Sequence, residues 1–205
     1  MPFAAQHIRT ARLHLQKADP VMKKIIKSVG PFTAKTRRDR FLTLVQSIVS
    51  QQISGAAAST ILGRLKDAMK PDGITPATIL AHDVDQLREL GVSRQKATYM
   101  LDLASNVDAG NVDLKAISRK DDVGVIEELT QIKGIGVWTA QMFMMFSLGR
   151  LDVFPDGDLG IQNAIKNSYP IKGDLTVAKM KKIAKPWHPY ATIASWYLWR
   201  SLEIE

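Results

Sequence analysis

The spacing of apolar residues predicts helices along most of the chain. Between residues 38 and 54, five apolar side chains recur every three or four positions and would lie on one side of a helix: Phe41, Leu44, Val45, Ile48 and Val49. Small residues follow in the stretch SGAAAST and allow close contact between helices. No segment alternates apolar and polar residues as a half-buried strand does. The pattern therefore predicts an all-α protein.

Further helices are expected wherever this spacing returns. The predicted segments are 84–90, 95–107, 124–131, 137–148, 159–166, 176–184 and 190–202. Short turns rich in glycine and proline separate them, and no low-complexity linker interrupts the chain. We expect roughly ten short helices, arranged as two lobes rather than as a simple bundle.

Charge adds a first indication of a partner. The 205 residues include 28 lysines and arginines against 20 acidic residues, a formal net charge of +8. A surface this basic concentrates anions, and nucleic acid is the most abundant candidate. Charge alone is weak support, because a charged face is usually only solvated.

Composition also excludes several kinds of chemistry. The chain has no cysteine, which removes disulfides, thiolate zinc sites, iron-sulfur clusters and a cysteine nucleophile. Its four histidines lie far apart in the sequence, so we expect no transition metal. Neither a membrane span nor a secretion signal is recognisable. We expect an intracellular protein without membrane association, in the bacterial cytoplasm or nucleoid, or in the nucleus of a eukaryote.

A glycine-rich turn stands out in the stretch QIKGIGVWTAQMF. Gly134 and Gly136 flank Ile135, and glycine adopts positive φ without a clash at Cβ. The chain can therefore reverse tightly between a helix ending near Gln131 and another beginning near Val137. Exposed amides at the start of the second helix would suit a phosphate, and Lys133 adds a positive charge. A bare Gly-x-Gly is more often an ordinary turn.

An acidic turn follows one helix later, in VFPDGDLGIQNAI. Proline, aspartate and glycine at positions 155–157 favour a turn, and Asp158 directly precedes the helix that begins at Leu159. From the local sequence alone, Asp158 is best interpreted as the residue that caps this helix.

Together the two turns resemble the helix-hairpin-helix DNA glycosylases. The hairpin pattern apolar-x-Gly-apolar-Gly-x-x-Thr-Ala, followed 22 positions after Gly136 by Asp158, matches that superfamily. The 3-methyladenine DNA glycosylase II branch is the most similar. The resemblance extends to DPVMKKIIKSVGPF, FLTLVQSIVSQQIS, GVSRQKA and KPWHPYATIASWYLWR, which together span nearly the whole chain.

The resemblance implies a two-lobed helical fold. The inner lobe would comprise residues 35–150, with the hairpin at 129–140, and the second lobe residues 1–34 with 151–205. The active-site cleft would lie between them. Some relatives carry an additional mixed α/β domain ahead of the helical core, and we expect this chain to be a minimal version without it.

Catalysis in that family depends on the aspartate that matches Asp158. A carboxylate can stabilise the positive charge that develops on the sugar as the base leaves, and it can also orient the attacking water. We expect Asp158 to be ionised, helped by the helix N-terminus. Bifunctional members have a lysine two positions after the second hairpin glycine, where this chain has Trp138. The resemblance therefore implies a monofunctional enzyme that leaves an intact abasic site and needs no catalytic cofactor.

Aromatic residues suit a cationic alkylated purine such as 3-methyladenine or 7-methylguanine. By resemblance, Trp138 and Trp196 line the base pocket. Trp187 and Tyr190 are either nearby substrate-binding residues or structural ones. Core packing is the commoner role of a single aromatic residue.

Contacts with double-stranded DNA are expected at three places. The hairpin residues that would bind the backbone are Lys133, Gly134, Ile135, Gly136 and Val137. Gln51, Gln52 and Ile53 occupy the position of the wedge that fills the gap left by a flipped nucleotide, with Gln52 aligned to the wedge itself, although they could equally be ordinary helix-end residues. Ser93, Arg94 and Lys96 could contact phosphate or merely form helix caps.

The family's hairpin carbonyls often hold a sodium or potassium ion. By resemblance, the carbonyls of Thr130, Ile132 and Ile135 would do so here. We expect a monomer acting on DNA that contains alkylated bases. Two alternatives stay open: a glycosylase for deaminated or etheno bases, and a noncatalytic DNA-binding module.

Overall fold

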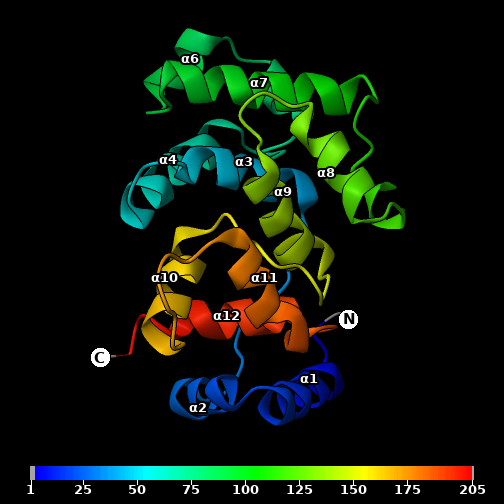
Figure 1. The fold of residues 1–205 in the computed structure, drawn as a ribbon. Coiled ribbons are helices and arrows are strands. Elements are labelled where there is room, and N and C mark those ends of the chain that lie inside the picture. Colours follow the sequence, from blue (N-terminus) through cyan, green and yellow to red (C-terminus); the bar gives the residue numbers. More distant parts are fainter. Residues whose placement is uncertain (1–2, 205) are drawn as a thin grey trace. The chain divides into compact units, whose positions relative to one another are not determined.

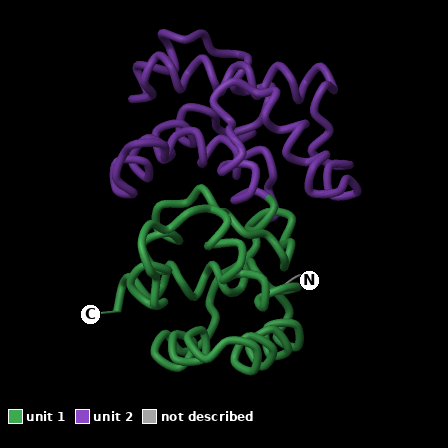
Figure 2. Tube along the Cα trace, viewed as in Figure 1, with its two compact units in different colours: residues 1–36, 144–205 green, residues 37–143 purple. Residues whose placement is uncertain are grey.

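The computed structural model describes residues 3–204. These residues form twelve α-helices, joined by short turns and brief 3₁₀ or π segments, and contain no β-strand (Figure 1). The all-α class predicted from the apolar spacing is thereby confirmed. The chain folds as two compact units, residues 37–143 and residues 1–36 with 144–205 (Figure 2).

The unit of residues 37–143 is built around α3 and α7. Its elements are α3 (Arg40–Ser50), α4 (Gly55–Ala68), α5 (Pro76–Leu80), α6 (Val84–Glu89), α7 (Arg94–Asp108), η1 (Ile117–Arg119), α8 (Asp122–Thr130) and α9 (Val137–Phe143). The five apolar residues predicted on one side of α3 are all buried. Helix α7 packs against α3, α5 and α6, and α9 packs against α3 and α8. This packing fixes the turn between α8 and α9.

The unit of residues 1–36 and 144–205 is built around α12. Its elements are α1 (Ala5–Ala18), α2 (Pro20–Val29), η2 (Met144–Leu148), α10 (Leu159–Ser168), α11 (Val177–Ala184), η3 (Lys185–Trp187) and α12 (Ala191–Ser201). Helix α12 packs against α1, α2 and α10, and Ala191 to Leu198 are all buried. The two ends of the chain therefore share one hydrophobic core.

A buried carboxylate joins α2 to the C-terminal part of the same unit. Asp19 caps α2 by accepting hydrogen bonds from the amides of Val21 and Met22, at 2.8 and 3.1 Å. Its second oxygen accepts the Tyr169 hydroxyl at 2.6 Å and the Trp187 indole N–H at 2.8 Å. Four donors thus compensate a carboxylate that is only 6% exposed.

One predicted helix differs in form. The expected helix at 137–148 is α-helical only to Phe143 and continues as the π-helical turn η2 over Met144–Leu148. Apolar spacing does not reveal a π-helical turn of five residues, because so short a segment cannot show a period of its own.

Candidate functional site

The two glycines of the hairpin between α8 and α9 have different roles. Gly134 has φ = 83°, in the left-handed region, whereas Gly136 does not. A Cβ on Gly134 would lie 2.1 Å from Cδ2 of the Tyr99 ring, and a Cβ on Gly136 would meet nothing within 4 Å. The expectation that both glycines provide conformational freedom is therefore wrong for Gly136. Gly134 alone needs to lack a side chain, both for its φ and for contact with α7.

The start of α9 presents backbone donors to solvent. Within residues 3–204, the amides of Gly134, Gly136 and Val137 donate no hydrogen bond to the chain. Gly136 and Val137 are exposed, and Trp138 is 46% exposed. Unpaired amides at a helix N-terminus attract anions. The hairpin thus has the geometry expected of a phosphate-binding turn.

Asp102 of α7 contacts the hairpin through Lys133. The Lys133 amide donates to Oδ2 of Asp102 at 2.9 Å, and its ammonium lies 3.7 Å from Oδ1. The Lys133 side chain is 70% exposed, so its charge still faces solvent although Asp102 partly balances it.

The turn between α3 and α4 contains the expected wedge residues. Gln52 and Ile53 are exposed, and Gln52 is in the left-handed region with φ = 55°. Gln51 instead points back into its own unit, where its Nε2 donates to the Gly134 carbonyl at 2.8 Å. This hydrogen bond joins the turn between α3 and α4 directly to the hairpin.

The segment 93–96 divides into capping and packing residues. Ser93 caps α7 by accepting the Lys96 amide at 3.4 Å, and Arg94 forms an exposed ion pair with Asp85 at 3.2 Å. The Lys96 ammonium donates to the carbonyls of Val49 and Gln51, at 2.8 and 2.6 Å. Of the three expected phosphate contacts, Arg94 alone has a solvent-facing charge that is not directed into the protein.

Monovalent cation binding at the hairpin would depend on backbone oxygens. Among residues 3–204, no three His, Asp or Glu side chains cluster in a way that could hold a metal ion. The Ile132 carbonyl accepts the Ile135 amide at 3.1 Å, which leaves a second lone pair. Carbonyl oxygens suit Na⁺ or K⁺, so the turn fits the expected ion in its donor chemistry.

Asp158 caps α10, as its local sequence indicates. Its Oδ1 accepts the Ile161 amide at 2.8 Å and, from α12, the Trp199 indole N–H at 2.8 Å. The side chain is half-buried and lies at the positive end of the α10 dipole. Two donors on one oxygen fix the carboxylate in a single orientation.

Sequence reasoning missed Trp199. The residue lies three positions after Trp196, on the same side of α12, and this spacing was the available signal. Its ring also explains Gly160, where a Cβ would lie 2.9 Å from Cδ1 of Trp199. Gly160 therefore lets the indole reach the carboxylate.

The expected base-binding aromatics have unequal surroundings. Trp196 is 8% exposed and packs on Phe32, with ring centroids 4.5 Å apart. Tyr190 is half-buried and contacts the His14 ring edgewise. Trp187 is fully buried and bonded to Asp19, so its ring belongs to the core and we do not retain it as a candidate for base binding.

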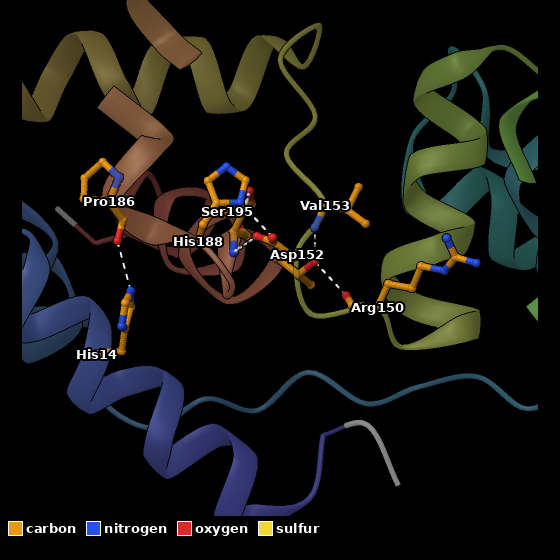
Figure 3. A network of polar contacts seen from close by, with 9 residues as sticks. His14, Arg150, Asp152, Val153, Pro186, His188 and Ser195 are labelled. Atoms are coloured by element: carbon orange, nitrogen blue, oxygen red, sulfur yellow. Dashed lines mark hydrogen bonds and ion pairs between the residues drawn. The ribbon is translucent and has the colours of Figure 1, made fainter. Parts of the chain in front are cut away.

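A polar network fixes the segment that leads toward Asp158 (Figure 3). Asp152 accepts the Ala191 amide at 3.2 Å and pairs with Nδ1 of His188 at 2.7 Å. The Thr192 hydroxyl accepts the Val153 amide at 3.0 Å and donates to the Arg150 carbonyl at 2.7 Å. The start of α12 thus anchors residues 150–153. His188 and Asp152 are 36 positions apart in the chain, so their spacing in the sequence does not predict this pair.

Comparison with known proteins defines the class to which this fold and these turns belong. Residues 45–189, well over half of the chain, match the HhH-GPD superfamily of base excision DNA repair proteins. The chain belongs to this family.

The comparison also finds individual proteins and solved structures that are similar to this chain. Bacillus subtilis YfjP is 36% identical over 78% of this chain, which spans only 58% of that protein. A Bacillus halodurans DNA-3-methyladenine glycosidase structure is 38% identical, with a TM-score of 0.81 and 93% of each chain covered. Schizosaccharomyces pombe Mag1, a 3-methyladenine DNA glycosylase solved with abasic DNA, is 32% identical, also with a TM-score of 0.81, over 93% of this chain and 95% of Mag1.

Within residues 3–204, no helix is long and apolar enough to span a membrane.

Proposed function

We propose that this protein is a monofunctional DNA glycosylase that hydrolyses the N-glycosidic bond of alkylated purines, such as 3-methyladenine and 7-methylguanine, and leaves an abasic site. The observation that carries the proposal is the carboxylate of Asp158, held by both the α10 N-terminus and the Trp199 indole. Its relatives named as 3-methyladenine glycosylases, with nearly full mutual coverage, support the substrate class.

The chemistry requires little acid catalysis. Alkylation gives the purine a positive charge, so the base leaves as a neutral molecule when the bond to C1′ breaks. Positive charge then develops on the sugar, and the oriented carboxylate of Asp158 stabilises it electrostatically. Water adds its oxygen to C1′ and releases a proton, which completes the hydrolysis.

Base recognition would rest on ring faces. The candidates are Trp138, which is 46% exposed, and Trp196, which is 8% exposed, with the half-buried Tyr190 as a third. Electron-rich rings attract a cationic base by stacking and cation–π interaction. Neutral purines lack that attraction, which would favour the damaged base.

DNA binding would use the hairpin and the wedge turn. The amides of Gly134, Gly136 and Val137 would bind phosphate, with Lys133 alongside. A sodium or potassium ion on the carbonyls of the hairpin would add positive charge there. Gln52, exposed at the tip of its turn, would fill the gap in the duplex.

Trp138 is the reason to expect a monofunctional enzyme. A lyase needs an amine that attacks C1′ and forms a Schiff base. An indole offers no such nucleophile, so water remains the acceptor and the strand stays intact.

The test is base release from methylated duplex DNA. Free bases are measured by chromatography, and strand nicking is measured before and after alkali. We expect methylpurines to be released, with nicks only after alkali. Nicks without alkali would contradict the monofunctional assignment. Release of deaminated or etheno bases alone would change the substrate class, and absence of any release would indicate a noncatalytic DNA-binding module.

A further inference from the structure

We propose that Lys96 is a positioning residue for base flipping: it holds the turn of residues 50–54 in the shape that presents Gln52 to the duplex. The inference rests on the proposed function, because it takes Gln52 as the wedge. It assigns Lys96 a role different from that of a phosphate contact.

The ammonium lies at the C-terminal end of α3. It donates to the Val49 carbonyl at 2.8 Å, in the last turn of the helix, and to the Gln51 carbonyl at 2.6 Å, just past the helix end. Terminal carbonyls of a helix lack intrahelical partners and carry the negative end of its dipole. Lys96 therefore serves as a cap supplied from α7.

The position of this cap matters because of the residue that follows it. Gln52 has φ = 55°, a left-handed conformation that residues other than glycine rarely adopt. Such a conformation persists only where the surroundings determine it. Gln52 is itself exposed, so the constraint must act through its neighbours, and Lys96 binds the carbonyl directly before it.

Helix α7 connects this cap to the hairpin. Lys96, Tyr99 and Asp102 follow one another at three-residue steps and lie on one side of the helix. Tyr99 packs on Gly134, and Asp102 accepts the Lys133 amide. The same side of α7 thus positions the turn that would bind phosphate and the turn that would enter the duplex.

Desolvation is consistent with this placement. Burial lowers the pKa of Lys96, since its ammonium is withdrawn from water toward the two carbonyls. A lysine that served only as a phosphate contact would keep its charge in solvent.

The experiment compares Lys96→Met, which removes the ammonium but keeps most of the stem, with Lys96→Arg, which keeps the charge and the donors. Lys66→Met, on the exposed surface of α4, removes the same charge elsewhere in the same unit. Single-turnover excision of 7-methylguanine is measured in a duplex and in a single strand, because only the duplex requires a wedge. Wedge insertion is followed separately, by the fluorescence of 2-aminopurine opposite an abasic analogue.

We expect Lys96→Met to slow excision from the duplex at least tenfold, about 1.4 kcal/mol in activation free energy, and excision from the single strand less than about twofold. Lys96→Arg should restore most of the duplex rate, and Lys66→Met should match the parent protein. Equal losses on both substrates, or no loss on the duplex, would overturn the inference.

If Lys96→Met does not unfold cooperatively, Lys96→Gln, whose shorter and uncharged side chain removes the ammonium but stays polar, is judged by the same comparison. If the parent protein releases no base, the proposed function fails, and the 2-aminopurine signal decides the role of Lys96: its loss in Lys96→Met supports the role and its retention refutes it.

Discussion

At the scale of single residues, the orientation of Asp158 depends on two donors from different helices. The Ile161 amide belongs to α10 and the Trp199 indole to α12, and both bind Oδ1 at 2.8 Å. Capping of α10 fully accounts for the contact with the Ile161 amide. The second contact goes beyond capping, because a helix N-terminus does not need an indole.

Replacing Trp199 by phenylalanine removes this donor but keeps an aromatic ring beside Phe146, whose centroid lies 6.1 Å away. We expect single-turnover excision to slow roughly ten- to hundredfold, since a hydrogen bond to a charged group contributes about 1.5–3 kcal/mol. Affinity for an abasic duplex should change little. Phe146→Leu is the control for ring packing, and a similar loss in both variants would argue against a specific role for the indole.

The buried hydroxyl of Tyr169 is expected to make the unfolding free energy fall as the pH rises through the alkaline range. Burial, and then the hydrogen bond to Asp19, raise the pKa of Tyr169 well above its ordinary value of 10.0. The stabilisation is therefore complete below the pKa of the unfolded chain and is lost as pH rises above it toward the folded value. Unfolding free energies from denaturant titrations between pH 8 and 11 should decline more steeply for the parent protein than for Tyr169→Phe. Parallel declines would contradict this assignment.

At the scale of elements, the hairpin requires one glycine rather than two. Gly134 is held in a left-handed conformation against Tyr99, whereas Gly136 lies in open space. The sequence pattern Gly-x-Gly does not reveal this difference, because the ring that excludes a Cβ comes from α7, 35 positions earlier.

Gly134→Ala and Gly136→Ala form a matched pair that tests it. The first should lower the unfolding free energy by more than about 2 kcal/mol, since a positive φ alone costs about 1–2 kcal/mol and the Tyr99 ring must also move. The second should change it by less than about 1 kcal/mol. Thermal and denaturant unfolding measure both, and equal destabilisation would refute the distinction.

Elements could be predicted from the sequence wherever apolar spacing was regular. The predicted helices at 95–107 and 159–166 correspond to α7 and α10 within a few residues. The features that could not be predicted from the sequence depend on contacts between residues far apart in the chain. The bonds that join Lys96 to the end of α3 and Asp19 to Tyr169 span 45 and 150 positions, and no local pattern indicates them.

At the scale of the whole molecule, the net charge of +8 predicts a strong electrostatic contribution to DNA binding. The hairpin amides and lysines would contact phosphates, which are the same in damaged and undamaged DNA. Lesion recognition adds affinity through the base alone.

The logarithm of the DNA dissociation constant should therefore rise linearly with the logarithm of salt concentration, with a slope near 0.9 per phosphate contact. Alkylated and undamaged duplexes should give the same slope and different intercepts, measured by fluorescence anisotropy at several salt concentrations. A flat line, or a slope seen only with the damaged duplex, would contradict this account of binding.

The candidate catalytic residue could be named from sequence, but its environment could not. The catalytic role of Asp158 followed from the resemblance to glycosylases, whereas the hydrogen bond from Trp199 to Asp158, the close approach of Trp199 to Gly160 and the Asp152–His188 pair became apparent only in three dimensions. Burial likewise removed Trp187 from the base-binding candidates, since a tryptophan in the core and one in a pocket are identical in sequence.

The most direct test of the account is the single-turnover rate of 7-methylguanine excision by Asp158→Asn. Asparagine caps helices about as well as aspartate, and its amide oxygen can accept the same two donors, so folding and DNA affinity should be preserved. Without the negative charge, excision should slow about 100- to 1,000-fold. A rate within about twofold of the parent protein, in a variant of unchanged stability, would contradict the role of the Asp158 carboxylate.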